Sequence, residues 1–236
     1  FSDNITVDGT TRGLARPDAT TRDLLGPKQR PKAEPTAAYN GAIVEVQSYS
    51  YKGIATVFHA ICEPLAYVHG QGVVHRDLSP VNVFLVDDTH AVLFDFGLAA
   101  QFRIDSARDV LEFGGRTRGT AHYMAPEQVR GEIVDARADI YALGCMLYEA
   151  LTGRPPFIAE QALAVVMMHL EVAPIPPSVL VPELPADLDA LVLRLLAKLP
   201  RDRFGYARDV AAALERLGAS PAQGPLATRQ ASGHVL

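Results

Sequence analysis

The chain has 236 residues, of which 48% are hydrophobic and 21% are charged, a balance typical of a globular protein and not of a disordered one. Its net charge of −5 and its pI of 5.8 argue against a general affinity for nucleic acid or anionic membranes. The length suits one domain, or one large domain with loose ends.

No membrane segment or leader is expected in this chain. The longest apolar run, residues 140–148, is too short to span a bilayer, and no charged-then-apolar secretory leader is present. Cys62 and Cys145 form no CxxC pair, so we expect both to be buried and reduced. These features predict a cytoplasmic protein, and the first residue, a Phe, leaves open whether the natural start precedes it.

The first half of the chain contains few regular elements. Residues 1–41 hold four prolines and no persistent period, so we predict an irregular segment, followed by a short strand at 43–46. Apolar residues recur at helical spacing from Ala55 to His69 and predict a helix that Pro64 kinks or weakens, because a proline inside a helix costs roughly 3 kcal/mol. Short β-branched runs predict small strands at 73–74, 83–86 and 91–94.

The second half is predicted to be helical. Asp139 to Thr152 is apolar on nearly every side and should form a buried central helix that ends at Gly153. Asp187 is expected to cap another helix, whose apolar stripe runs from Leu188 to Leu199. Further helices are predicted at 160–170 and 207–217, and residues 218–236 read as a disordered tail or the start of a linker.

Three motifs occur in a fixed order: His-Arg-Asp-Leu-Ser-Pro-Val-Asn at 75–82, Asp-Phe-Gly at 95–97 and Ala-Pro-Glu at 125–127. They resemble the catalytic loop, the magnesium loop and the end of the activation segment of a protein kinase. Residues 139–149 resemble the central helix of the kinase C-terminal lobe (C-lobe), and residues 200–204 resemble the late segment that carries a structural arginine.

The resemblance runs from about residue 43 to residue 217 and is greatest to bacterial serine/threonine kinases. It implies an α+β, protein-kinase-like fold with a mainly helical C-lobe, short β-hairpins around the catalytic loop and a truncated or degenerate N-terminal lobe (N-lobe). The domains implied are an irregular segment at 1–41, a candidate N-lobe remnant at 42–54, the C-lobe at 55–217 and the tail at 218–236.

The same resemblance implies ATP and Mg²⁺ as cofactors and proteins as substrates. Asp77 would orient the acceptor hydroxyl and take its proton, while Asn82 and Asp95 would be the magnesium ligands. Oxygen ligands of this kind suit a hard cation, and phosphoryl transfer depends mainly on positioning and charge neutralisation.

Regulatory and structural roles also follow from the resemblance. Arg76 would pair with a phosphate on Thr117 or Ser106, and Thr120 would line the site near Asp77. Three residues would be architectural, with Glu127 and Arg203 forming a buried ion pair and Asp139 accepting hydrogen bonds from the catalytic-loop backbone, while His75 would pack and hydrogen-bond.

Two features depart from the kinase pattern. Ser79 stands where most serine/threonine kinases carry a lysine that helps to hold the γ-phosphate, and some bacterial kinases share this Ser-Pro version. No GxGxxG loop is present, and none of the four lysines follows a Val-Ala-type strand. Three readings stay open: an active serine/threonine kinase, a kinase-like scaffold (pseudokinase) with a partner at an exposed lobe interface, or a truncated remnant.

Overall fold

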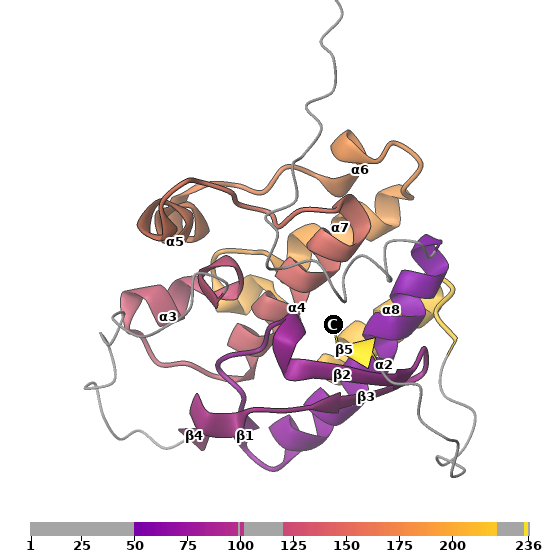
Figure 1. Cartoon of the computed structure of the whole chain (residues 1–236), viewed down its shortest axis with the longest axis horizontal. Helices are drawn as coiled ribbons and strands as arrows, with labels where there is room; N and C mark the ends of the chain where they lie inside the picture. The colour runs from indigo at the N-terminus through magenta and orange to yellow at the C-terminus, as the bar shows by residue number, and fades with distance from the viewer. Residues whose placement is uncertain (1–49, 99, 102–119, 221–233, 236) are drawn as a thin grey trace, which may run out of the picture. The chain divides into compact units, whose positions relative to one another are not determined.

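The computed structural model describes residues 50–98, 100–101, 120–220 and 234–235, which form a mainly helical body with short strands (Figure 1). All of them belong to one compact unit, residues 36–236. The predicted irregular segment at 1–41 and the predicted strand at 43–46 lie outside the described residues.

The helices are α2 (Tyr51–Gly70), α3 (Pro126–Arg130), α4 (Ala136–Thr152), α5 (Ala162–Glu171), α6 (Pro177–Leu180), α7 (Ala186–Leu195) and α8 (Ala207–Arg216). Short 3-10 segments are η1 (Pro80–Asn82), η2 (Phe96–Leu98), η3 (Thr120–Tyr123) and η4 (Pro200–Asp202). The strands are β1 (Val73–Val74), β2 (Val83–Asp87), β3 (His90–Leu93), β4 (Ala100–Gln101) and β5 (His234–Val235).

The strands form two small antiparallel sheets around the segment that carries the His-Arg-Asp motif. One sheet pairs β1 with β4, and the other has the order β3-β2-β5, with an irregularity between Leu85 and Asp87. The hairpin β2–β3 begins directly after η1 and leads into the Asp-Phe-Gly motif. The two motifs are therefore held at the same end of one hairpin.

Helix α4 forms the centre of the core, as its all-round apolar sequence predicts, and Figure 1 shows α2 and α7 beside it. It begins three residues before the expected Asp139, because the carboxylate of Asp135 accepts the backbone N–H of Arg137 and caps the helix. It ends at Gly153, whose φ of 77° is the left-handed conformation that glycine adopts most easily.

Helix α2 packs along α8 and against β3. It begins at Tyr51 instead of Ala55, because the Ser50 hydroxyl accepts the backbone N–H of Gly53 and caps an additional turn. Pro64 lies inside the helix. The ring of His59, which is buried, lies 2.9 Å from Oε1 of Glu215 and ties α2 to α8.

The predicted cap of α7 is wrong. The helix begins at Ala186 after Pro185, and Asp187 lies in its first turn, where a carboxylate still complements the partial positive charge of the helix start. The apolar stripe is also shorter than predicted, because the helix ends at Leu195 and Leu199 is exposed.

Part of the predicted disordered tail has ordered contacts. Ala219 is buried, and the backbone N–H of Ser220 donates to the Thr56 hydroxyl at 3.0 Å. His234 and Val235 then form β5 on the edge of β2. Within the described ranges, no helix is long and apolar enough to cross a membrane.

Candidate active site

The segment that carries the His-Arg-Asp motif lies between β1 and η1 and is anchored to α4 by one carboxylate. Oδ2 of Asp139 accepts the backbone N–H of His75, and Oδ1 accepts the backbone N–H of Arg76, each at 2.8 Å. Nε2 of His69, in α2, also lies 2.8 Å from Oδ2. Asp139 is only 1% exposed, so these three contacts replace the water that the charge has lost.

The same anchor holds a strained backbone. Arg76 has a φ of 67°, a left-handed conformation that costs a non-glycine residue on the order of 1–3 kcal/mol. Two hydrogen bonds hold this residue in place. Its N–H donates to Asp139, and its carbonyl accepts Nε2 of Gln128 at 2.7 Å. This left-handed conformation turns the chain between His75 and Asp77. It therefore fixes the position of the Asp77 backbone, from which the side chain extends.

His75 has a structural position. Its ring is fully buried, Nε2 lies 2.7 Å from the carbonyl oxygen of Phe94, and the ring centre lies 4.7 Å from that of Phe96. The imidazole therefore joins the His-Arg-Asp motif to the Asp-Phe-Gly motif.

Asn82 makes the second connection between these motifs. Its Nδ2 donates to the backbone carbonyl of Asp77 at 2.8 Å, and its own backbone carbonyl accepts the N–H of Phe94 at 2.9 Å. Asp95 follows Phe94 directly, so Asp77, Asn82 and Asp95 are brought onto adjacent loops. Asn82 is buried and Asp77 is half-buried, whereas Asp95 is exposed.

The donor set fits magnesium. Because Nδ2 of Asn82 is turned to a protein carbonyl, its side-chain oxygen is the atom left for a cation. Asp95 has a φ of 55° and accepts the N–H of Gly97 with one oxygen at 3.2 Å, which orients the carboxylate. One amide oxygen and one carboxylate, completed by phosphate and water oxygens, are a usual Mg²⁺ environment. Within the described ranges, this site included, no group of three or more His, Cys, Asp or Glu is placed to hold a metal ion, so phosphate and water oxygens would have to complete the shell.

Ser79 lies in the same motif, between Asp77 and Asn82, but contributes differently to the site. It is buried, its backbone carbonyl accepts the N–H of Asn82 at 3.0 Å, and its hydroxyl does not cap η1. The residue thus shapes the turn that carries Asn82. It supplies a hydroxyl near the catalytic loop but no positive charge.

The end of the predicted activation segment is tied to the rest of the body by an ion pair. Nη1 and Nη2 of Arg203 donate to the two carboxylate oxygens of Glu127 at 2.6 and 2.8 Å, and both side chains are buried. The guanidinium also donates to the carbonyls of Ala197, Arg137 and Lys198. Each nitrogen of this buried guanidinium therefore donates to at least one acceptor.

Among the other predicted residues, Thr117 and Ser106 lie outside the described residues. Thr120 opens η3, and its side chain is not described. Arg76 is half-buried, and within the described part of the chain its buried Nε has no hydrogen-bond partner. The expected pairing with a phosphorylated Thr117 or Ser106 therefore stays a prediction.

Two contacts were missed by the sequence interpretation. Gln128 accepts the N–H of Ala125 with Oε1 and donates to the carbonyl of Arg76, which links the Ala-Pro-Glu segment to the catalytic loop. Its place three residues after Ala125 is the spacing of a capping box, a signal that could have indicated the first bond but not the second. The second contact joins His69 to Asp139, which lies 70 residues further along the chain, so no local pattern indicates it.

Tyr123 of η3 and Glu149 of α4 form a further pair that the sequence did not indicate. The Tyr123 hydroxyl donates to Oε2 of Glu149 at 2.5 Å. Burial raises the pKa of Glu149 to about 7, although the hydrogen bond from Tyr123 acts in the opposite direction. The carboxyl group is therefore partly protonated near neutral pH.

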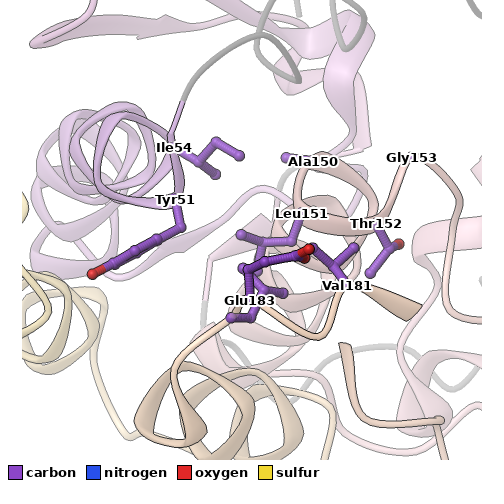
Figure 2. A pocket seen from close by; sticks show the side chains of 9 residues that line it. Tyr51, Ile54, Ala150, Leu151, Thr152, Gly153, Val181 and Glu183 are labelled. Carbon is purple, nitrogen blue, oxygen red and sulfur yellow. The ribbon is translucent and has the colours of Figure 1, made fainter. Parts of the chain in front are cut away.

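A cavity of about 370 Å³ lies elsewhere on the molecule. Figure 2 shows Tyr51 and Ile54 of α2 on one side of it, Leu151 near the end of α4 on the other, and Glu183, from the segment between α6 and α7, below them. None of its lining residues belongs to the His-Arg-Asp or Asp-Phe-Gly motifs. It is therefore separate from the candidate active site.

Comparison with known proteins agrees with this arrangement. The sequence model described as the protein kinase domain matches residues 34–214. The serine/threonine-protein kinase PknB of Mycobacterium tuberculosis H37Rv is 45% identical over 157 residues, which are 66% of this chain and 25% of that protein. PknB of Mycolicibacterium smegmatis is 42% identical over 156 residues, also 66% and 25% of the two chains.

A probable serine/threonine-protein kinase of Corynebacterium efficiens is 38% identical over 191 residues, which are 79% of this chain and 28% of that protein. The chain thus spans about a quarter of the length of these relatives. The domain match and these relatives indicate the same family, and the helical body with few strands agrees with it. The chain belongs to the protein kinase family, in its bacterial serine/threonine branch, and its described residues form the mainly helical C-lobe of that fold.

Proposed function

We propose that the chain is a serine/threonine protein kinase homologue that transfers the γ-phosphate of ATP to Ser or Thr of proteins. Asp77 would orient the acceptor hydroxyl and take its proton, a role that typically contributes about 10²–10⁴-fold. Asn82 and Asp95 would hold Mg²⁺, which neutralises charge on the phosphates when bound. The observation that carries this proposal is the pair of hydrogen bonds by which Asn82 joins Asp77 to Phe94 and so to Asp95.

The acceptor side of the reaction is supported by the contacts of the Ala-Pro-Glu segment. Gln128 connects this segment to the backbone of Arg76, next to Asp77. The Glu127–Arg203 pair fixes the segment to the loop around η4. A substrate peptide seated near η3 would therefore lie over a rigid support beside the proposed base.

Arg76 is the candidate regulatory residue. Its guanidinium would pair with a phosphate on Thr117 or Ser106, and its buried Nε, without a partner in the described part of the chain, supports a role in binding an acceptor group. A phosphate carries acceptor oxygens that suit a guanidinium. Thr120 would line the same region.

The test is phosphate transfer from labelled ATP with Mg²⁺, to the chain itself and to a generic Ser/Thr substrate, in the original protein and in Asp77→Asn. We expect label on Ser or Thr that falls by at least about 100-fold in the variant. Asn keeps the size of the side chain but accepts no proton. Equal labelling in both proteins would contradict the role of Asp77.

A second candidate function is a kinase-like scaffold, and one observation favours it. Apolar side chains are exposed on and beside the β2–β3 hairpin, with exposed fractions of 66% for Val81, 40% for Val92, 49% for Phe94 and 39% for Phe96. Clustered exposed apolar groups mark a surface that another protein covers. A folded sample that transfers no phosphate but binds a partner through Val81 and Phe94 would favour the scaffold over the enzyme.

A further inference from the structure

Lys198 lies between α7 and η4, where its side chain reaches the end of α5. Nζ donates to the carbonyl of Met168 at 3.3 Å and lies 4.3 Å from the centre of the Phe157 ring. Among the residues described, no Asp or Glu lies within ion-pairing distance of it. Nζ of Lys198 thus contacts one carbonyl and one aromatic ring, where the ammonium group of an ordinary lysine contacts water.

The carbonyl and the ring favour the ammonium form, whereas burial and the charged groups around Lys198 act against it. Arg203 donates to the Lys198 carbonyl at 3.2 Å, and Arg130 of α3 is also close enough to act on its charge. The carboxylate nearest to Arg203 is that of Glu127, which the guanidinium already pairs. No uncompensated negative charge in the described ranges therefore faces Nζ.

The titratable neighbours on α4 and α5 are neutral. Burial raises the pKa of the Cys145 thiol, which stays protonated. Burial lowers the pKa of His169 in α5 to about 3, with Lys198 and His122 of η3 acting in the same direction. Neither group offers a counter-charge near neutral pH.

As a consequence, the uncharged amine makes up a larger fraction of Lys198 side chains than of ordinary lysine side chains. Burial lowers the pKa of Lys198 to about 8, and Arg203 and Arg130 lower it as well, whereas Cys145 would oppose this only as a thiolate. At pH 7.5 about a quarter of such groups are uncharged, against about 0.1% of lysines with an ordinary pKa. The side chain is also half-exposed, so a small reagent can reach it.

We propose that Lys198 is an acylation site, modified by small activated acyl donors of the acyl phosphate or acyl thioester class. The Nζ lone pair attacks the acyl carbon and an N–C bond forms. The C–O bond of the acyl phosphate, or the C–S bond of the thioester, breaks and releases phosphate or thiolate. One Nζ proton goes to solvent. The product is a neutral amide that keeps one N–H donor but no longer places a cation over Phe157.

This proposal stands apart from phosphoryl transfer, because it needs neither ATP nor Asp77. Lys52 provides the comparison within the same molecule. It lies in the first turn of α2 and is exposed, so access to reagents favours Lys52 and only the chemical environment favours Lys198.

The test is limited acetylation of the folded chain by acetyl phosphate from pH 6.5 to 10, with initial rates for each lysine measured by peptide mass spectrometry. We expect Lys198 to react at least about tenfold faster than Lys52 at pH 7. Its rate should level off above about pH 8.5, while that of Lys52 continues to rise. A parallel series with acetyl-coenzyme A distinguishes the thioester from the acyl phosphate as donor.

Repeating the reaction in guanidinium chloride shows whether the fold causes the difference. The advantage of Lys198 should vanish when the chain is unfolded, because Met168, Phe157 and Arg130 no longer surround it. Equal rates for Lys198 and Lys52 in the folded chain would overturn the proposal. So would an advantage that persists in the unfolded chain.

Discussion

Asp139 shows how one buried carboxylate organises the catalytic loop. It receives two backbone N–H groups and the His69 ring, and it is the residue through which α4 reaches the strained Arg76. The resemblance to kinases indicated the backbone bonds, because that role follows the motif residue by residue. The contact with His69 could not be predicted, because it depends on how α2 and α4 pack.

Replacing Asp139 with Asn should destabilise the fold by about 3–5 kcal/mol, because the amide keeps one acceptor oxygen and turns an N–H₂ group toward a backbone donor. Urea denaturation measures this change. The control is Asp202→Asn, an exposed position where we expect a change within about 0.5 kcal/mol. Equal stabilities of the two variants would contradict the anchoring role.

Glu149 makes stability depend on pH. Its pKa is raised from 4.5 to about 7 by burial, so the folded state binds the proton more tightly than the unfolded state. The resulting stabilisation is fully present below pH 4.5 and is lost as the pH rises through 7. The difference corresponds to about 3 kcal/mol.

The variant Glu149→Gln should lack this dependence, because its amide does not titrate. We expect the original chain to lose about 2.5 kcal/mol relative to the variant between pH 5 and pH 8, measured by urea denaturation at both values. His169, with its lowered pKa, changes stability in the opposite direction on the acid side but does so in both proteins. Parallel pH profiles would show that Glu149 titrates normally.

At the scale of elements, the packing of α4 against α7 depends on one glycine. A Cβ atom placed on Gly144 would lie 2.6 Å from Cβ of Leu195, closer than two such atoms can approach. The glycine therefore lets the central helix approach its neighbour, at a cost in helix propensity of about 1 kcal/mol relative to Ala.

The substitution Gly144→Ala should destabilise the chain by about 1–3 kcal/mol in spite of its better helix propensity, because the helices must separate. Gly70→Ala is the matched control, since it also lies in a helix and a Cβ there meets nothing within 4 Å. Thermal denaturation should show a lower midpoint for the first variant and an equal or higher one for the second. A higher midpoint for Gly144→Ala would rule out the close approach.

Element types were easier to predict than element ends. The periodicity of α2 and the apolar sequence of α4 indicated both helices, but Ser50 and Asp135 extended them beyond the apolar pattern. Asp187 has the right chemistry for a cap and lies two residues too late, because Pro185 precedes the helix. Strand β5 pairs residues more than 140 positions apart, which no local pattern indicates.

At the scale of the whole molecule, the order of motifs along the chain predicted which loops would meet. The His-Arg-Asp and Asp-Phe-Gly motifs do meet, through His75 and Asn82. The hydrogen bond from Gln128 to the Arg76 carbonyl could not be predicted, because it depends on where α3 packs. The positions of Thr117 and Ser106 lie outside the described residues, so their pairing with Arg76 rests on the resemblance.

The exposed apolar groups beside the active site also belong to this scale. Val81 and Phe96 belong to the two motifs and Phe94 directly precedes Asp95, so we expect a partner that covers these exposed side chains to restrict access to Asp77 as well. Catalysis and partner binding at this surface are therefore competing uses of the same region. A measurement of nucleotide binding separates them without requiring turnover.

The most direct test is Mg²⁺-dependent binding of ADP by calorimetry, in the original chain and in Asp95→Asn. Asp95 is exposed, so the variant should fold normally. We predict binding that weakens at least about tenfold in the variant, and equally in the original chain when Mg²⁺ is chelated, because both changes remove the contact between carboxylate and metal. Folded protein that binds no nucleotide, or binds it equally well without Mg²⁺ and without the Asp95 carboxylate, would contradict the proposed site.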